Sequence, residues 1–184
     1  GATGLKLYTG HGYVNKQSGR YMFHPMAMDD PRMFPVYEYC EKNNVPVLIH
    51  VNTGSNAPGF AEEFIAMLTR YPDMRVICPH FMLTSRNLGQ LREFLASFPN
   101  LYSDISFGDA FMKDGLTRIS NNIQGFQKLF KDYPDRFMFG TDLVLTVEPK
   151  KTVEWIQNIS EAYLDMLTKE TYTTSTVPDQ TLKG

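Results

Sequence analysis

The sequence has little of what marks several large classes of protein. Its 184 residues include two cysteines, Cys40 and Cys78, both in apolar surroundings. This usage is typical of free buried thiols in a reducing compartment, so we expect no disulfides and a cytoplasmic location. No apolar run approaches the roughly 18 residues of a membrane span. The net charge of -2, with scattered lysine and arginine, favours neither nucleic acid nor a membrane as a partner.

What the sequence does contain is an ordinary globular composition. Hydrophobic residues make up 42% of the chain and charged residues 21%. A chain of this length can bury one sizeable core, so we expect a single domain over 1–184, with an ordered core over about 1–168 and a polar tail over 169–184. There is no initial methionine and no signal peptide, and we interpret both ends as cut.

Short apolar runs alternate with amphipathic runs along the chain. The apolar runs predict strands at 4–8, 45–50, 74–80, 101–106 and 136–142. Apolar residues at helical spacing predict helices at about 31–43, 58–70, 88–98, 119–130 and 149–168, the first capped by Asp30. A glycine-rich polar loop is expected over 9–28, and a loop or frayed end over 171–184. Strands that alternate with helices at a spacing of about 30 residues indicate βαβ units and a parallel sheet.

Three of these predicted strands end in a polar residue that could bind a ligand. The strands at 45–50, 74–80 and 136–142 end in His50, His80 and Asp142. Both an open doubly wound sheet and part of a (β/α)8 barrel fit the alternation, and in both the carboxyl ends of the strands carry the site. We therefore expect the three side chains to converge on one end of the sheet. Imidazole nitrogen and carboxylate oxygen are also ligands of divalent metals.

The alternation of side chains within the strands adds two expectations. In the first strand Lys6 lies between two leucines and should point to the opposite face, toward a barrel axis. In the last strand Met138, Gly140 and Asp142 should share one face. The glycine would leave room for a metal or a substrate beside the carboxylate.

Each candidate also has a structural interpretation. A histidine at a strand end is often only hydrogen-bonded, and Asp142 could cap a following helix. Lys6 could extend its stem along the edge of the sheet. Asp104 could bind only backbone amides. His11 and His24 lie in the predicted polar loop, where exposure to solvent is expected.

Five segments, taken in order, resemble the later strands of the metal-dependent amidohydrolase superfamily. They are "GLKLYTGHGY", "DDPRMFPVYEYCEKNNVPVLIHVNTG", "YPDMRVICPHFM", "NLYSDIS" and "RFMFGTD". The closest likeness is to the branch of the aminocarboxymuconate-semialdehyde decarboxylase and 2-pyrone-dicarboxylate lactonase relatives. The resemblance covers about residues 1–168. It implies an α/β fold, a parallel (β/α) TIM barrel of the metallo-dependent hydrolase type.

The resemblance also implies roles for individual residues. His50 matches the metal ligand of the fifth barrel strand, His80 the histidine of the sixth, and Asp142 the aspartate of the eighth. Lys6 matches the lysine of the fourth strand, which some two-metal relatives carboxylate. Lys6, His11 and Tyr13 are candidates for binding a substrate carboxylate or carbonyl group.

One departure from the family pattern is large. The family takes two further ligands from a His-x-His motif on its first strand, and this sequence contains no such motif. Only five strands are predicted, whereas a barrel needs eight and about 250 residues. We therefore interpret the sequence as strands 4–8 of a partial barrel. Such a chain is expected to form homo-oligomers or to pair with the missing N-terminal segment.

For the complete enzyme, the resemblance implies metal-assisted hydrolysis of a small carbonyl or carboxylate substrate. Zinc is the expected metal, since it lowers the pKa of a bound water to about 7. Asp142 would bind the metal and accept the proton of that water, and His80 would stabilise the developing oxyanion. Two alternatives stay open: non-oxidative decarboxylation on the same scaffold, and an inactive barrel fragment with a structural role.

Overall fold

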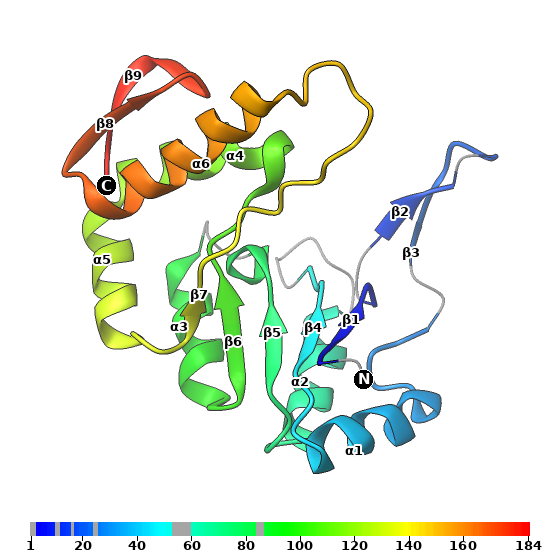
Figure 1. Ribbon diagram of the computed structural model, residues 1–184. Coiled ribbons are helices and arrows are strands. Elements are labelled where there is room, and N and C mark those ends of the chain that lie inside the picture. Colours follow the sequence, from blue (N-terminus) through cyan, green and yellow to red (C-terminus); the bar gives the residue numbers. More distant parts are fainter. Residues whose placement is uncertain (1–2, 10–11, 16, 24–25, 53–59, 84–86) are drawn as a thin grey trace. The chain divides into compact units, whose positions relative to one another are not determined.

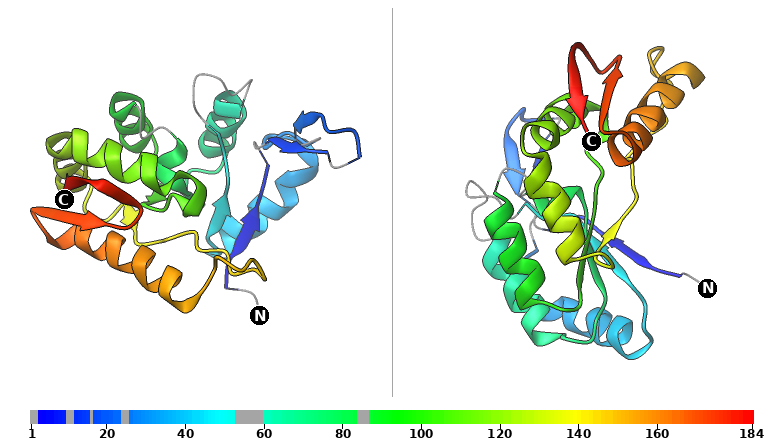
Figure 2. Two further views of the ribbon diagram at one scale, coloured as in Figure 1. Left: turned by 90° about the horizontal axis from the view of Figure 1, so that it is seen from above. Right: turned by 90° about the vertical axis from the view of Figure 1, so that its left-hand side faces the viewer.

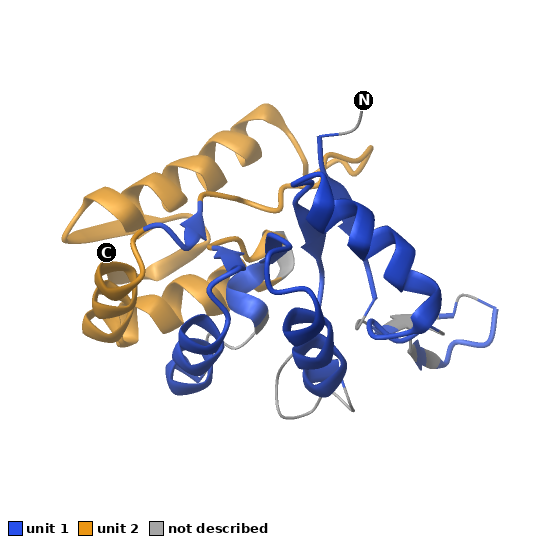
Figure 3. Cartoon of the chain, turned by 90° about the horizontal axis from the view of Figure 1, so that it is seen from below, with its two compact units in different colours: residues 1–104, 135–138 blue, residues 105–134, 139–184 orange. Residues whose placement is uncertain are grey.

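The computed structural model describes residues 3–9, 12–15, 17–23, 26–52, 60–83 and 87–184 (Figure 1). The chain divides into two compact units, which Figure 3 shows in two colours. Unit 1 comprises Gly1–Asp104 and Asp135–Met138, and unit 2 comprises Ile105–Pro134 and Phe139–Gly184. Each unit is described by itself.

Unit 1 is built on a parallel sheet. Within the described residues this sheet has five strands, β1 (Leu5–Leu7), β4 (Val47–Ile49), β5 (Val76–Cys78), β6 (Leu101–Asp104) and β7 (Phe137–Met138). They lie side by side in chain order, β1-β4-β5-β6-β7, and every pair is parallel. A doubly wound sheet reverses its strand order at a switch point, whereas a barrel adds each strand beside the preceding one. The order confirms the predicted fold class, a partial (β/α) barrel.

Three helices connect the first four of these strands and lie on one side of the sheet (Figures 1 and 2). They are α1 (Phe34–Lys42), preceded by the 3-10 turn η1 (Pro31–Met33), then α2 (Phe60–Arg70) and α3 (Leu88–Ser97). The predicted cap is confirmed, because the Asp30 carboxylate accepts the N–H of Arg32 at the start of η1. The apolar stripes predicted on α1 and α2 are buried. Their residues are Met33, Tyr37 and Cys40, and Phe60, Phe64 and Leu68.

The two faces of the sheet are covered to different extents. Residues that pair across parallel strands point to the same face, so Val47 and Val76 share one face while Lys6, Leu48 and Ile77 share the other. On the first face Val47, Ile49, Val76, Cys78 and Leu101 are completely buried. On the second face Leu48, Ile77 and Tyr102 are half-buried and Lys6 is exposed. We call these the covered face and the open face.

Two short hairpins replace segments that were predicted as loops. The strands β2 (Gly12–Val14) and β3 (Tyr21–Phe23) pair within the predicted polar loop, and Gly19 supplies the positive φ of 66° between them. The strands β8 (Thr171–Thr174) and β9 (Val177–Lys183) pair where a frayed tail was expected. The prediction of a tail was wrong because so many of its residues are polar. Three apolar side chains, Tyr172, Val177 and Leu182, bury one side of the hairpin.

The helices of unit 2 are α4 (Gly108–Asn121), α5 (Ile123–Asp132) and α6 (Val153–Thr168). The run predicted as one helix breaks at Asn122, whose φ of -135° and ψ of 44° end α4 and begin α5. The hairpin β8–β9 packs on α4 and α6, and the N–H of Lys183 donates to Ser120 Oγ at 2.8 Å. Within the described ranges, every helix is too short or too polar to cross a membrane.

The last predicted strand is much shorter than the pattern indicated. Its final ladder pair joins Asp104 to Met138, because β6 ends there and offers no partner to the residues that follow. The chain beyond Met138 leaves the sheet, and Asp142 has a left-handed φ of 52°. The prediction that Met138, Gly140 and Asp142 share a strand face was therefore wrong.

Candidate active site

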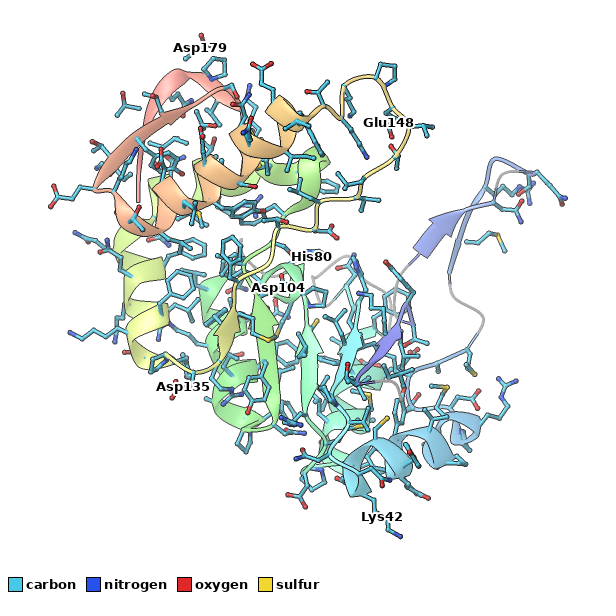
Figure 4. The ribbon with its side chains drawn as sticks, in the orientation of Figure 1. Lys42, His80, Asp104, Asp135, Glu148 and Asp179 are labelled. Carbon is cyan, nitrogen blue, oxygen red and sulfur yellow. The ribbon has the colours of Figure 1, made fainter. Side chains whose placement is uncertain are left out.

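The carboxyl ends of β1, β4, β5 and β6 gather a group of polar and aromatic side chains in unit 1. They are Tyr8, His50, His80 and Asp104, each at or just beyond the end of its strand. Figure 4 shows His80 and Asp104 beside each other at the ends of β5 and β6. A parallel sheet presents all its carboxyl ends at one edge, so residues far apart in sequence meet there.

His50 is held in place by the continuation of the ladder. Its N–H donates to the carbonyl of Leu7 at 3.0 Å, so the pairing of β4 with β1 extends one residue beyond the strand. Its ring stacks on Tyr8, with ring centroids 5.8 Å apart and an interplanar angle of 20°. Backbone and ring together therefore fix the imidazole at the edge of the sheet.

His80 begins an unusual turn after β5. His80, Phe81 and Met82 have φ values of 61°, 50° and 55° within the turn η2 (His80–Leu83). Left-handed backbone costs a residue other than glycine about 1–2 kcal/mol. Two features offset this cost: Phe81 and Met82 are completely buried, and the His80 N–H donates to Asp104 Oδ1 at 2.9 Å. Asp104 therefore anchors the backbone that carries the imidazole.

The two imidazoles lie close enough to bind one ion. Their ring centroids are 4.9 Å apart, and the rings meet at 62°. Two histidines that share a tetrahedral zinc at Zn–N distances near 2.0 Å have ring centroids about 5 Å apart. The residue type and the distance between the rings of His50 and His80 are therefore compatible with a zinc site. A catalytic zinc takes three protein ligands, and the described residues contain no group of three histidine, cysteine or acidic side chains that could hold an ion. The pair thus places one candidate metal ligand, His50, next to a second imidazole, His80, that can face a bound substrate.

Asp142 belongs to unit 2, where it lies against the start of α4. A Cβ atom placed on Gly108 would come within 2.9 Å of Asp142 Oδ2, and Gly108 has a positive φ of 63°. Glycine therefore gives the carboxylate access to the first residue of this helix, whose N-terminus favours negative charge. Asp142 does not cap the helix that follows it, because Thr152 caps α6. The predicted convergence of Asp142 with the two histidines stays a prediction.

The remaining candidates differ in how far the structure describes them. Lys6 is exposed on the open face, and its Nζ lies 4.7 Å from the centroid of the Tyr8 ring. Tyr13 is in β2, where it pairs with Met22, and its side chain is outside the described part. His11 also lies outside the described residues. The substrate-binding roles of all three stay predictions.

Sequence reasoning missed the part that Asp104 and Tyr8 play. Asp104 was considered only as a residue that could bind backbone amides, and it does so, but the amide belongs to His80, 24 positions away. The sequence offered little signal for this, because the strand was predicted over 101–106 with Asp104 inside it, whereas β6 ends at Asp104 in the structure. Tyr8 follows β1 and contacts both His50 and Lys6.

Cys78 lies at the end of β5, in surroundings that disfavour the thiolate. The side chain is completely buried, and burial raises the pKa of the thiol to about 12. Its Sγ is 3.9 Å from the carbonyl oxygen of Val51. Because metal binding and nucleophilic attack need the thiolate, Cys78 is a structural residue of the covered face. As predicted, both cysteines are buried and free.

The fold and this edge of the sheet define a class: an α/β barrel protein with paired histidines where barrel enzymes carry their sites. The family comparison is consistent with this. The model of the amidohydrolase family matches residues 1–170, so the chain belongs to the amidohydrolase family. Among curated proteins no relative matches.

Solved structures with a similar chain path are distant. An uncharacterised TIM-barrel protein from Bordetella bronchiseptica is 21% identical, with a TM-score of 0.45 over 75% of this chain and 53% of that one. An amidohydrolase from Burkholderia multivorans with bound zinc is 14% identical, with a TM-score of 0.47 over 73% and 51%. The same enzyme with bound HEPES is 15% identical, with a TM-score of 0.45 over 73% of this chain and 52% of that one. The chain thus spans about half the length of the structures it matches.

Proposed function

We propose that this chain carries part of the active site of a metal-dependent hydrolase that acts on a small carbonyl or carboxylate substrate. The observation that carries the proposal is the pair of imidazoles, 4.9 Å apart at the carboxyl ends of adjacent strands. Family membership supports it, because the chain matches the amidohydrolase model over almost its whole length. Within the family we place the chain in the branch of the semialdehyde decarboxylase and lactonase relatives, on the strand-end motifs.

In this proposal His50 and Asp142 hold the metal, and zinc is the ion that the imidazole donors suit best. The bound ion supplies a water of lowered pKa and polarises the scissile carbonyl group. His50 contributes a neutral ring nitrogen, and its stacking on Tyr8 fixes the orientation of the ring. Asp142 accepts a proton at a carboxylate oxygen and later returns it to the leaving group.

His80 acts on the substrate side. Its imidazole stabilises the negative oxygen that forms during attack, a task for which a fixed position matters more than basicity. The bond from the His80 N–H to Asp104 holds that position. Lys6, His11 and Tyr13 bind the substrate carboxylate or carbonyl, and Lys6 lies on the open face that corresponds to a barrel interior.

Metal binding tests the ligand assignment. We expect the purified chain to take up zinc, and we expect His50→Asn to weaken zinc binding at least about tenfold, since an imidazole donor is lost. His24→Asn is the matched control, because it removes a histidine to which the proposal gives no role. Inductively coupled plasma mass spectrometry after equilibrium dialysis measures the metal. Equal zinc content in the wild type, His50→Asn and His24→Asn would contradict the proposal.

Product analysis separates hydrolysis from the alternative, non-oxidative decarboxylation. The zinc-loaded protein would be incubated with small lactones, amides and unsaturated carboxylic acids. Hydrolysis releases a titratable acid from a lactone, whereas decarboxylation releases CO₂ and takes up a proton. Acid release that Asp142→Asn abolishes and Asp179→Asn leaves unchanged supports the hydrolase, with Asp179 as an exposed control on β9. Release of CO₂ without acid formation would assign the alternative.

A further inference from the structure

A pocket in unit 1 lies between helices α1 and α2. Its volume is about 230 Å³, and none of its lining residues belongs to the candidate active site. Met28, Tyr37, Met67 and Tyr71 contribute buried side chains, while Asp29 and Arg70 are exposed. The pocket therefore has an apolar interior with two charged groups of opposite sign at its rim.

Hydrogen bonds between the two helical segments hold the walls of this pocket. The N–H of Met28, just before α1, donates to Glu63 Oε2 on α2 at 3.0 Å. The N–H of Asp73, just after α2, donates to Glu41 Oε1 on α1 at 3.0 Å. Because the segments are joined at two places, the space between them is largely pre-formed, as it is in ligand sites.

Tyr37, one of the residues that line the pocket, has a buried hydroxyl group that the described residues leave unsatisfied. Tyr37 is completely buried, and its hydroxyl oxygen has no hydrogen-bond partner among them. A buried hydroxyl without a partner costs free energy, so such groups are uncommon in native structures. Burial raises the pKa of Tyr37 well above its ordinary range, with further contributions from Tyr71 and Asp29, both of which line the pocket. The hydroxyl thus stays neutral and able to donate.

Arg70 is positioned at the rim by aromatic contacts. Its guanidinium carbon lies 4.0 Å from the centroid of the Phe34 ring, and its Nε donates to the Tyr71 hydroxyl at 3.2 Å. No carboxylate in the described ranges forms an ion pair with it. Its hydrogen bond to Tyr71 uses Nε, so the two Nη groups can bind a ligand. A planar guanidinium fixed in this way suits bidentate binding of a carboxylate.

We propose that this pocket binds a small aromatic carboxylic acid that carries a second polar group. The carboxylate would meet the Nη groups of Arg70, the ring would contact Phe34, Met28 and Met67, and the polar substituent would be directed to the Tyr37 hydroxyl. The Asp29 carboxylate at the same rim disfavours a second negative charge, so the ligand is a monoacid. A volume of about 230 Å³ lies below the roughly 300 Å³ at which typical drug-sized sites begin, which limits the ligand to a single ring.

The test uses 4-hydroxybenzoate and benzoate as probes, followed by NMR of ¹³C-methyl methionines. Met28 and Met67 line the pocket, and Met112 and Met166 in unit 2 serve as internal references. We expect saturable shifts of the Met28 and Met67 methyl groups and tighter binding of 4-hydroxybenzoate than of benzoate. Arg70→Gln should raise the apparent Kd of both probes about tenfold, the loss expected for a hydrogen bond to a charged group. Arg92→Gln on α3 is the matched control and should leave Kd unchanged.

Tyr37→Phe tests the second polar contact without removing the ring. We expect it to abolish the preference for 4-hydroxybenzoate and to leave benzoate binding unchanged. The proposal is overturned if neither probe shifts the Met28 and Met67 resonances at millimolar concentration, or if Arg70→Gln binds both probes as the wild type does. A preference for 4-hydroxybenzoate that persists in Tyr37→Phe would overturn the assignment of the hydroxyl.

Discussion

The two faces of the parallel sheet in unit 1 differ in what lies against them. Helices α1, α2 and α3 bury the covered face, where Val47, Ile49 and Val76 have no exposed surface. The open face is half-buried at Leu48, Ile77 and Tyr102 and carries the exposed Lys6. In a closed barrel the side without helices is the interior, filled by layers of side chains. The comparison shows that the chain's own helices stabilise one face, while the other is available for functional groups.

The largest expected effect comes from the same substitution on the two faces. Ile49→Ala removes a completely buried side chain from the covered face and should lower the free energy of unfolding by about 2–5 kcal/mol. Ile77→Ala, on the adjacent strand and the open face, should cost less than half as much, because its side chain is only half-buried. Urea denaturation of both variants measures the difference. Equal losses would show that the two faces are equally packed.

The next effect concerns the end of the sheet. Asp104→Ala leaves the His80 N–H without its acceptor, next to three left-handed residues, and should cost about 1–3 kcal/mol. Asp104→Asn keeps an oxygen acceptor and should cost less. Asp135→Ala removes an exposed carboxylate of the same unit and should change stability by less than about 0.5 kcal/mol. If Asp104→Ala and Asp135→Ala melt alike, the anchoring role of Asp104 is refuted.

These effects bear on what the sequence could predict. The covered face was predictable, because apolar runs and helical spacing report burial locally, as Phe60, Phe64 and Leu68 on α2 show. The positions of His50 and His80 at strand ends followed from the same runs. The link between Asp104 and His80 did not, since it joins positions 24 apart that only the strand order brings together.

The end of β7 shows a second limit. The prediction that side chains alternate as far as Asp142 assumed that the pairing of β7 with β6 continues. β6 ends at Asp104, so the residues after Met138 have no partner strand there. Strand length depends on the neighbouring strand as well as on the strand's own residues. The C-terminal hairpin was missed for a related reason. Its many threonines were interpreted as a polar tail, although threonine favours strands. The three buried apolar residues of the hairpin are sufficient to pack its two strands on the helices of unit 2.

A smaller change in stability is expected for a substitution on helix α1, which packs on the covered face. Tyr37→Phe removes the buried hydroxyl of α1 that has no hydrogen-bond partner in the described part of the chain. The variant should therefore be as stable as the wild type or more stable by up to about 1 kcal/mol. Thermal unfolding monitored by circular dichroism checks this. A clear loss of stability would mean that the hydroxyl has a partner, and it would weaken the case for the pocket.

The smallest effect concerns pH and the start of the same helix. Hydrogen bonds from Arg32 lower the pKa of Asp30 from 3.8 to about 2. Because the pKa is lower in the folded state, the ionised cap stabilises the fold above pH 3.8, and this contribution is lost as the pH falls toward 2. Carbon-detected NMR titration of Asp30 measures the pKa directly. Arg32→Gln should return it toward 3.8, whereas an unchanged value would exclude Arg32 as the cause.

Because both thiols are buried, they can be used to measure how fast the structure around them unfolds locally. Cys40 on α1 and Cys78 on β5 are buried, and burial raises the pKa of each thiol. A thiol reagent therefore reacts with them only while the surrounding structure is transiently open. Both belong to unit 1, so the labelling rate of the unmodified protein reports the opening of structure in that unit. Comparing Cys40→Ser with Cys78→Ser then tells whether the helix α1 detaches before the sheet separates.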